Sequence, residues 1–437
     1  MTITKTKRSL CAAAGALGLT ATQIAAQLPS ASAAALGMGD NFTAAARALN
    51  AVAWNPAGLG LRGGAAASMT LLTARGSNGI DPVTLSDLAS FAGTVVPAAV
   101  KEDWLARIEA SGGETGTGAV EATWAAFHVG RLAFQLSSAS RVLGDVSPGL
   151  ARLIMFGNTD ENGDPRSLDL GGSSFRLHAY STAAASWGNP FDLAGGGRLA
   201  LGITASYTWG HVLAFGERSQ GSAIAEPLAV DLVFPVIQTR LDPDSLRLDS
   251  GRGFNLDAGA ALQTGAWTFA AVVRNILSGF AWNADELRYR PLSFTFREGE
   301  SSTRTEALPI AAAPAALRSL ADDLRFRPAI ALGAMTAPSD RLVVTADARL
   351  ASDDGLLTAP TRHLGAGLQY RVLSWLPVRA GAAAIAMGEG DPGFQLGFGL
   401  GLDLAGVNVA GSFARRTTDR LGAETTFMLT ILSTGLR

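Results

Sequence analysis

Long runs of alternating apolar and polar residues recur through most of the chain. In the clearest run, Phe394 to Leu404, every second residue is large and apolar, and the residues between are glutamine, glycine and aspartate. Successive side chains of a strand point to opposite faces, so this run predicts a strand with one apolar face. Leu199 to Trp209, Phe254 to Gln263 and Leu364 to Val372 repeat the pattern. Runs of about ten residues are longer than most strands of soluble sandwiches and suit tilted strands that cross lipid.

The joins between these runs predict how many strands there are. Six joins are short and seven are longer or more polar, and the two kinds alternate along the chain. The short joins lie at residues 128–131, 189–197, 264–266, 336–340, 373–377 and 405–406, and the long ones at 76–117, 143–171, 217–252, 277–325, 352–360, 388–392 and 417–421. We therefore predict an all-β, antiparallel outer-membrane barrel of about 14 strands, with short periplasmic turns and long outer loops. The ambiguous segment Leu287–Arg297 would raise the count to sixteen.

The second face of the predicted strands is small and polar. It consists of glycine, alanine, serine and threonine, with an occasional charge such as Asp257, Arg274 or Asp347. This face predicts a lumen kept open for contents, and the alternating glycines of the Phe394–Leu404 run are expected to clear space for a plug. Aromatic residues near strand ends fit the girdle of a membrane barrel. They are Trp187, Tyr207, Trp209, Trp267 and Trp375. A large soluble β-solenoid or sandwich is the alternative.

Composition agrees with a barrel. Charged residues make up 16% of the chain, below the usual level of about 25%, and 51 glycines accompany a mean hydropathy of +0.22. The sequence nevertheless contains no uninterrupted apolar stretch long enough for a membrane-spanning helix. A hydrophobic chain of this kind fits strands whose apolar side chains alternate with small and polar ones.

The first 33 residues read as a signal peptide. Basic residues open it, an apolar middle runs from Leu10 to Ala21, and cleavage is expected after Ala33 or, alternatively, after Ala26. The formal net charge of the full chain is −2, and removal of the three basic residues of this segment leaves −5. Cys11 is the only cysteine and is lost with it. The mature chain therefore has no disulfide or thiol chemistry, and its acidity argues against nucleic acid as a partner.

Residues 34–62 differ from the strands that follow. A short apolar helix, capped by Asp40 or Asn41, is expected to run into the turn Trp54–Leu59. Pro56 is expected to end the helix, because the residue before a proline is pushed out of the α region. This order of elements predicts a plug enclosed by the barrel of residues 63–437.

The same residues carry a family resemblance. A helix of small residues that runs into Trp54, Asn55, Pro56, Ala57, Gly58 and Leu59, after a signal peptide and before barrel strands, resembles the N-terminal hatch of FadL-type long-chain fatty-acid transporters and of the related PorV-type barrels. Arg47 and Ala48 depart from that pattern, because relatives often carry an acidic pair there. The close match covers about 25 residues.

The resemblance implies a function and a location. A FadL-type barrel takes up hydrophobic small molecules passively across the outer membrane of a Gram-negative-type bacterium, and its hatch residues, here Trp54 to Leu59, control the path. Its partners are outer-membrane lipid and a hydrophobic ligand. A PorV-type barrel instead acts in protein secretion or surface attachment, with secreted proteins as partners.

Two outer loops carry more apolar residues than a free loop needs. In loop 76–117 two helices are expected, and their apolar stripes either form a capture groove for the ligand or cover each other and the rim. The stripes are formed by Leu85, Leu88, Phe91, Trp104, Leu105 and Ile108. In loop 217–252 the stretch 228–237, which includes Phe234, is expected to fold inward as a gate or to pack beneath the first loop. Pro235 argues against a regular central strand there.

No catalytic, cofactor or metal site is predicted, and the chain is not expected to be an enzyme. The four histidines are scattered among strands without the spacing of a catalytic triad. Asp160, Asn162 and Asp164 resemble the start of a calcium loop, but Pro165 occupies the position that requires glycine. A solvated turn is the expected structure of that stretch.

Overall fold

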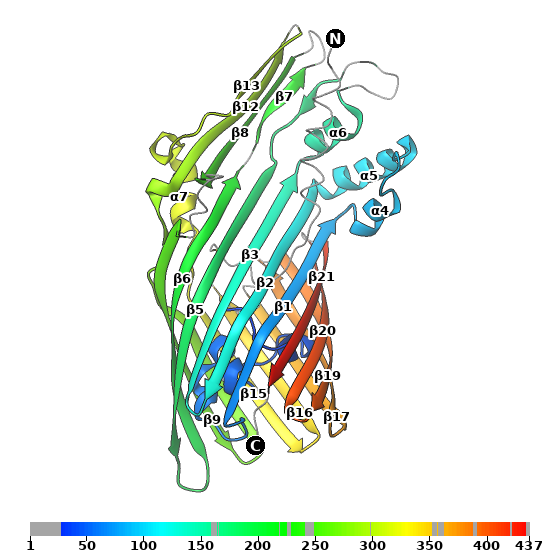
Figure 1. Cartoon of the computed structure of the whole chain (residues 1–437). Coiled ribbons are helices and arrows are strands. Elements are labelled where there is room, and N and C mark those ends of the chain that lie inside the picture. Colours follow the sequence, from blue (N-terminus) through cyan, green and yellow to red (C-terminus); the bar gives the residue numbers. More distant parts are fainter. Residues whose placement is uncertain are drawn as a thin grey trace.

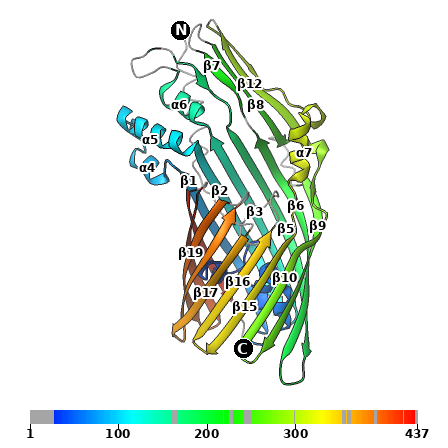
Figure 2. The same cartoon turned by 180° about the vertical axis from the view of Figure 1, so that it is seen from behind.

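The protein is a closed antiparallel β-barrel (Figures 1 and 2). The computed structural model describes residues 28–158, 164, 166–217, 219–224, 229–240, 249–297, 299–351, 356, 362–387, 391–419 and 422–433. Fourteen strands form the wall, and each pairs with the next until the last pairs with the first. They are β1 (Ala67–Asp81), β2 (Glu114–Val129), β3 (Leu132–Val146), β5 (Ser174–Asp192), β6 (Arg198–Gly216), β9 (Gly251–Thr264), β10 (Trp267–Ser278), β15 (Ala329–Ser339), β16 (Leu342–Ala351), β17 (Arg362–Leu373), β18 (Leu376–Met387), β19 (Asp391–Leu404), β20 (Val407–Thr418) and β21 (Gly422–Ser433).

The count of fourteen strands predicted from the joins is confirmed. The six short turns lie together at one end of the barrel and the long loops at the other, as Figure 1 shows. The alternation is confirmed as well. In β19, Phe394, Phe398 and Leu400 are about half exposed on the outside, whereas Gln395 between them is 1% exposed. Strands with an apolar outer face and a small or polar inner face close because a barrel leaves no unpaired edge.

The wall is much taller on one side than on the other. β5 and β6 each have 19 residues, whereas β16 on the opposite side has 10. Figure 2 shows the short strands β15 to β19 from the front, with the tall strands rising behind them. Short strands extend the tall side beyond the barrel rim: β4 (Leu168–Asp169), β7 (Gln220–Ile224), β8 (Ala229–Thr239), β11 (Ala281–Trp282), β12 (Leu287–Arg297), β13 (Glu300–Arg304) and β14 (Leu308–Pro309).

This extension corrects one expectation and resolves another. The stretch predicted to be an inward gate is instead the strand β8, which pairs along its whole length with β12. Pro235 is tolerated because, on the other edge of β8, it falls between the pairing with β7, which ends at Val233, and the pairing with β6, which begins at Val236. The ambiguous segment 287–297 is the strand β12, but it lies outside the closed ring and does not raise the count to sixteen.

The helices lie in the outer loops and inside the barrel. In the outer loops are α4 (Leu85–Ser90), α5 (Ala98–Ser111), α6 (Pro148–Phe156), η3 (Ala284–Glu286), η4 (Ile310–Ala312) and α7 (Ala315–Asp323). Within the described residues, none of the helices combines the length and the apolar content that crossing a bilayer requires.

Residues 28–61, which we call the inner segment, occupy the lumen near the turn end of the barrel (Figure 1). They contain α2 (Ala34–Gly37), η1 (Ala48–Asn50), α3 (Ala51–Trp54) and η2 (Pro56–Gly60). The expected helix capped by Asp40 or Asn41 is wrong. Asp40 adopts a left-handed φ of +62° after the end of α2, and the side chains of Asp40 and Asn41 bond to the barrel wall. These side chains therefore make hydrogen bonds to the barrel wall in place of the predicted helix cap.

Candidate functional site

The turn of the inner segment that follows Trp54 rests on a row of glycines. Gly188, Gly202 and Gly259 are direct cross-strand neighbours on β5, β6 and β9. A Cβ would lie 2.7 Å and 2.6 Å from the carbonyl oxygen of Pro56 at Gly188 and Gly202, and 3.1 Å from Pro56 Cδ at Gly259. Only glycine permits so close an approach of another backbone, so this row forms a seat for the turn.

A second glycine row lies on the other side of the lumen. Gly367, Gly381 and Gly397 are direct neighbours on β17, β18 and β19. A Cβ would lie 2.7 Å from the carbonyl oxygen of Met38 at Gly367, and 2.5 Å and 2.7 Å from the amide nitrogen of Gly39 at Gly381 and Gly397. The two rows hold the inner segment between opposite walls.

The expectation that the glycines of β19 clear space for a plug is confirmed for two of them. Gly397 faces Leu36 and Gly39, and a Cβ on Gly399 would lie 3.1 Å from the Cα of Gly37. Gly401 instead faces Pro377 and Arg379 of the neighbouring strand. The inner segment therefore covers only part of this strand.

The Asn-Pro-Ala turn has a local reason for its shape. The Asn55 side-chain oxygen accepts a hydrogen bond from the amide of Ala57 at 3.0 Å, and Pro56 occupies the first position of η2. An asparagine cap followed by proline is a strong start for a helical turn. The backbone oxygen of Asn55 also accepts a hydrogen bond from Gly58 at 2.9 Å. With Leu59 6% exposed and Asn55 1% exposed, the turn is buried.

Trp54 anchors the centre of the inner segment. Its side chain is 1% exposed, and its Nε1 donates a hydrogen bond to Ser30 Oγ at 3.2 Å. The guanidinium carbon of Arg349 lies 5.5 Å from the ring, within the range of a cation–π contact. Arg274 of β10 donates to the carbonyl oxygen of Trp54 at 3.1 Å. Strand β16 therefore contacts the ring of Trp54, and strand β10 contacts its backbone.

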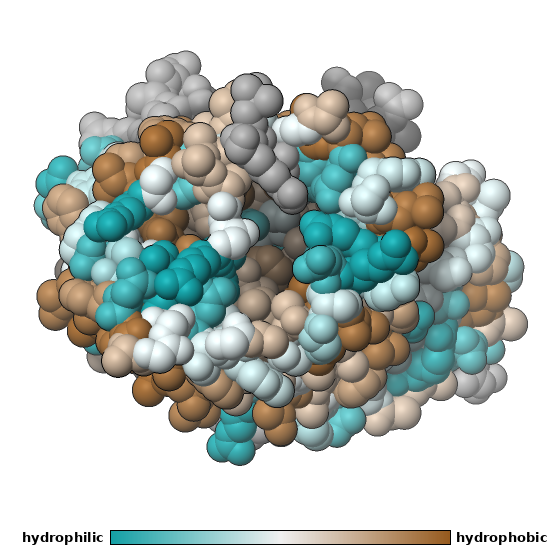
Figure 3. Space-filling model, turned by 90° about the horizontal axis from the view of Figure 1, so that it is seen from below, coloured by the Kyte–Doolittle hydropathy of each residue, from teal (hydrophilic) through white to brown (hydrophobic). Residues whose placement is uncertain are grey.

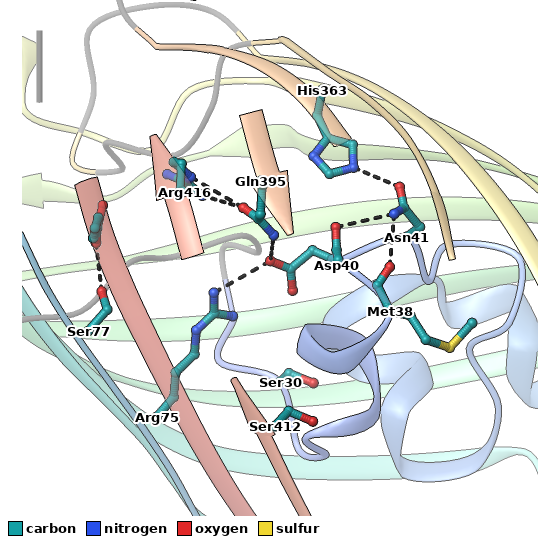
Figure 4. A network of polar contacts seen from close by, with 12 residues as sticks. Ser30, Met38, Asp40, Asn41, Arg75, Ser77, His363, Gln395, Ser412 and Arg416 are labelled. Carbon is teal, nitrogen blue, oxygen red and sulfur yellow. Dashed lines mark hydrogen bonds and ion pairs between the residues drawn. The ribbon is translucent and has the colours of Figure 1, made fainter. Parts of the chain in front are cut away.

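A network of buried polar groups joins the inner segment to the wall, as Figure 4 shows. Asp40 forms an ion pair with Arg75 of β1 at 3.5 Å and accepts a hydrogen bond from Gln395 of β19 at 2.9 Å. Gln395 in turn accepts from Arg416 of β20 at 3.0 Å. The left-handed backbone at Asp40 directs its carboxylate into this network. A buried charge whose partner is removed costs several kcal/mol, about 3–5.

Asp347 of β16 provides a second polar anchor. One of its carboxylate oxygens accepts hydrogen bonds from the amides of Phe42 and Thr43 at 3.0 Å and 2.9 Å, and from Thr43 Oγ1 at 2.6 Å. His363 of β17 donates to the side-chain oxygen of Asn41 at 2.9 Å. Sequence reasoning noted Asp347 only as a polar residue of the lumen. Its partner could not be found, since the pairing depends on how the inner segment folds.

The apolar stripe predicted for the second outer helix, α5, is buried. Trp104, Leu105 and Ile108 of α5 are 6%, 4% and 1% exposed, and they pack with Ala151 of α6. Phe91 contacts the Trp104 ring edge-on at a centroid distance of 5.8 Å. These residues cover one another and the helix beside them, and they leave no open groove among themselves.

The apolar stripe of the first outer helix, α4, is exposed. Leu85 and Leu88 of α4 are 46% and 42% exposed. The helix begins with a capping box in which the amide and hydroxyl of Thr84 donate to Asp87, which lowers the pKa of that carboxyl. Phe234 of β8, predicted to belong to an inward gate or to pack beneath the first loop, contacts Phe175 of β5 at a ring-centroid distance of 5.5 Å.

An aromatic cluster lies in the barrel on the loop side of the inner segment. Tyr180 of β5 meets Phe326 edge-on at 5.3 Å, and Phe280 lies 5.1 Å from Phe326 and 5.4 Å from Trp282. These four side chains are at most 9% exposed. Seen from the turn end, the molecule is hollowed near its middle, and hydrophilic residues flank the hollow (Figure 3). In the described parts of the chain, no group of three or more metal-ligating side chains occurs. The predicted solvated turn at 160–164 falls outside those parts, except for Asp164.

The fold and the inner segment define a class of protein, the transmembrane β-barrel whose own N-terminal residues occupy part of its lumen. Three solved structures share this fold at a TM-score of 0.52, each aligned over 94% of this chain and 100% of its own length. They are a FadL homologue from Pseudomonas aeruginosa (14% identity), the toluene transporter TodX from P. putida (11%) and the monoaromatic hydrocarbon channel CymD (11%). No family model and no curated protein sequence matches the chain.

Proposed function

We propose that the protein is an outer-membrane channel for the passive uptake of hydrophobic small molecules, and that residues 34–62 act as its hatch. The observation that carries the proposal is the aromatic cluster of Tyr180, Phe280, Trp282 and Phe326, which lies inside a lipid-facing wall above a tightly held inner segment. An apolar cluster behind a polar closure suits a ligand that water solvates poorly. Two of the solved structures that share the fold are named as a toluene transporter and a monoaromatic hydrocarbon channel.

The hatch role is supported by how the inner segment is held. Its two bends sit on glycine rows, and its polar groups, including the charged Asp40, bond to wall residues on β1, β16, β17 and β19. The backbone of the inner segment fits closely against the glycine rows of the wall. A small displacement of the segment would therefore break many of these contacts together. A shift of the turn at residues 55–58 would open a path between the inner segment and β5, β6 and β9.

The exposed side chains of α4 suit ligand capture. Leu85 and Leu88 lie outside the barrel on the loop side, where a ligand would first meet the protein. The alternative of a PorV-type role in secretion gains no support from the structures that share the fold. A signal peptide that is removed on export and an outer-membrane location complete the proposal.

The test is uptake by cells that lack the gene, compared with the same cells supplied with the wild-type protein. Labelled toluene and labelled oleate, each at low concentration, serve as ligands. We expect restored uptake of at least one of them, and a changed rate with Trp54→Ala or Pro56→Gly. Unchanged uptake in the deletion strain, with loss of surface proteins, would overturn the proposal in favour of the secretion role.

A further inference from the structure

Four polar side chains meet on the inner wall beside the aromatic cluster. Glu121 lies on β2, Arg141 on β3, and His178 and Tyr180 on β5. Arg141 is directly opposite His178 in the strand register, and Tyr180 follows His178 by two positions and so points to the same side of the sheet. All four side chains therefore face one patch of the lumen.

These side chains keep hydrogen-bonding capacity that the described residues do not use. Atoms without a partner there are Nε and Nη1 of Arg141, both ring nitrogens of His178, the hydroxyl of Tyr180 and one carboxylate oxygen of Glu121. Each of the four residues is at most 2% exposed. Native proteins satisfy nearly all buried polar atoms, because an unmade hydrogen bond is costly. A concentration of such atoms on one patch marks a place where a ligand can bind.

The surroundings of the patch set the shape of the ligand. The Tyr180 ring is stacked on His178 at 6.1 Å and meets Phe326 edge-on at 5.3 Å. Phe280 and Trp282 continue the aromatic surface behind Phe326. Aromatic side chains recognise flat rings by stacked and edge-on contacts. The patch therefore combines a surface for an aromatic ring with donors at its edge.

The charges of the lumen set the charge of the ligand. Arg75, Arg141 and Arg416 interact electrostatically with Asp40, Glu121 and Glu424. These three positive and three negative side chains cancel when all are ionised, and Arg176, which also acts on Arg141, is paired with Glu217 at 3.3 Å. An anionic ligand would therefore add an uncompensated charge to a buried site, which is unfavourable. A neutral oxygen would accept the N–H of Arg141 and the hydroxyl of Tyr180 without that cost.

We propose that this patch is a binding site for a neutral aromatic molecule that carries a hydroxyl or carbonyl oxygen, such as a phenol or an aryl ketone. Its oxygen accepts hydrogen bonds from Arg141 and Tyr180, its hydroxyl, where present, donates a hydrogen bond to a ring nitrogen of His178, and its ring lies against Phe326. The inference rests on the proposed channel function and makes it more specific. It separates oxygenated aromatics from carboxylate-bearing ligands and from plain hydrocarbons.

Binding of three matched probes to the purified full chain in proteoliposomes tests the site. At pH 7, 1-naphthol is neutral and oxygenated, 1-naphthoate is anionic, and naphthalene has the ring system alone. Equilibrium dialysis against empty liposomes of the same lipid corrects for partitioning. We expect saturable binding of 1-naphthol that is about tenfold or more tighter than that of either other probe, because a hydrogen bond to a charged group is worth about a factor of ten or more.

Two variants test the residues. Tyr180→Phe removes only the hydroxyl, and Glu121→Gln combined with Arg141→Gln removes the guanidinium while keeping the charges balanced. Tyr180→Phe is expected to weaken 1-naphthol binding about fivefold and the double variant about tenfold or more, and both are expected to leave naphthalene binding unchanged. Tyr207→Phe is the matched control, because Tyr207 packs with Trp209 and Phe254 rather than in the patch.

The outcomes distinguish the two levels of the proposal. Tighter binding of 1-naphthoate than of 1-naphthol would overturn the neutral site, and so would unchanged 1-naphthol affinity in Tyr180→Phe. If the protein still restores uptake of toluene or oleate to cells in either case, the channel function stands and only this inference fails. If it restores uptake of neither, the channel function fails with it.

Discussion

A methyl group at Gly202 should displace the hatch. The Cβ of Gly202→Ala would overlap the backbone of Pro56 and Ala57 and would lie 2.6 Å from the Pro56 carbonyl oxygen, where ordinary contact begins at 3.4 Å. Neither partner is the end of a flexible side chain, so the turn itself must move. Overpacking of a tight interior costs about 1–3 kcal/mol. At about 1.4 kcal/mol per factor of ten, the ratio of displaced to seated hatch should rise about 5- to 150-fold.

Ion conductance across a planar bilayer measures this change. The displaced hatch should appear as more frequent or longer open events in Gly202→Ala than in the wild type. Gly411→Ala is the matched control, because a Cβ there meets no atom within 4 Å. Both variants must first show the gel shift on heating that marks a folded barrel. A folded Gly202→Ala protein with the conductance of the control would refute the idea that the glycine row seats a closure.

Three further results are expected. Asp347→Asn should lower the free energy of unfolding in detergent by about 1.5–3 kcal/mol, as measured by urea titration, because it removes a charged acceptor of three hydrogen bonds. Mass spectrometry of the mature N-terminus should show cleavage after Ala26 rather than Ala33, because the residues just before Ala33 are buried and bonded inside the barrel. Leu85→Ser combined with Leu88→Ser should slow uptake at low ligand concentration and leave the maximal rate unchanged.

Each of these expectations has a result that contradicts it. Asp340→Asn, in an exposed turn, should behave as wild type, and an equal loss of stability in both aspartate variants would remove the special role of Asp347. A mature chain that starts at Ala34 would show that residues 28–33 of the inner segment are absent from the mature protein, and would contradict cleavage after Ala26. Wild-type uptake at low concentration by the double serine variant would exclude α4 from ligand capture.

Local patterns in the sequence were enough to predict the wall. Whether a side chain faces lipid or lumen depends only on its parity along the strand, so the run from Phe394 to Leu404 reveals its own orientation. Short and long joins alternate because the two ends of the barrel differ, and that alternation gave the fourteen strands. The Asn55–Pro56 turn is likewise a local feature, since its cap and its proline are adjacent.

Only the tertiary structure decided which inner residues meet. Asp40 and Gln395 are 355 positions apart, and their hydrogen bond depends on closure of the barrel and on its register. For the same reason the predicted cap at Asp40 was wrong, because a buried network outweighs a local hydrogen bond. The strand at residues 229–239 was missed because its stability comes from β12, about sixty residues later. The alternation of apolar and polar side chains depends only on residues that are neighbours in the sequence. Contacts across the lumen join distant residues and form only once the wall has closed.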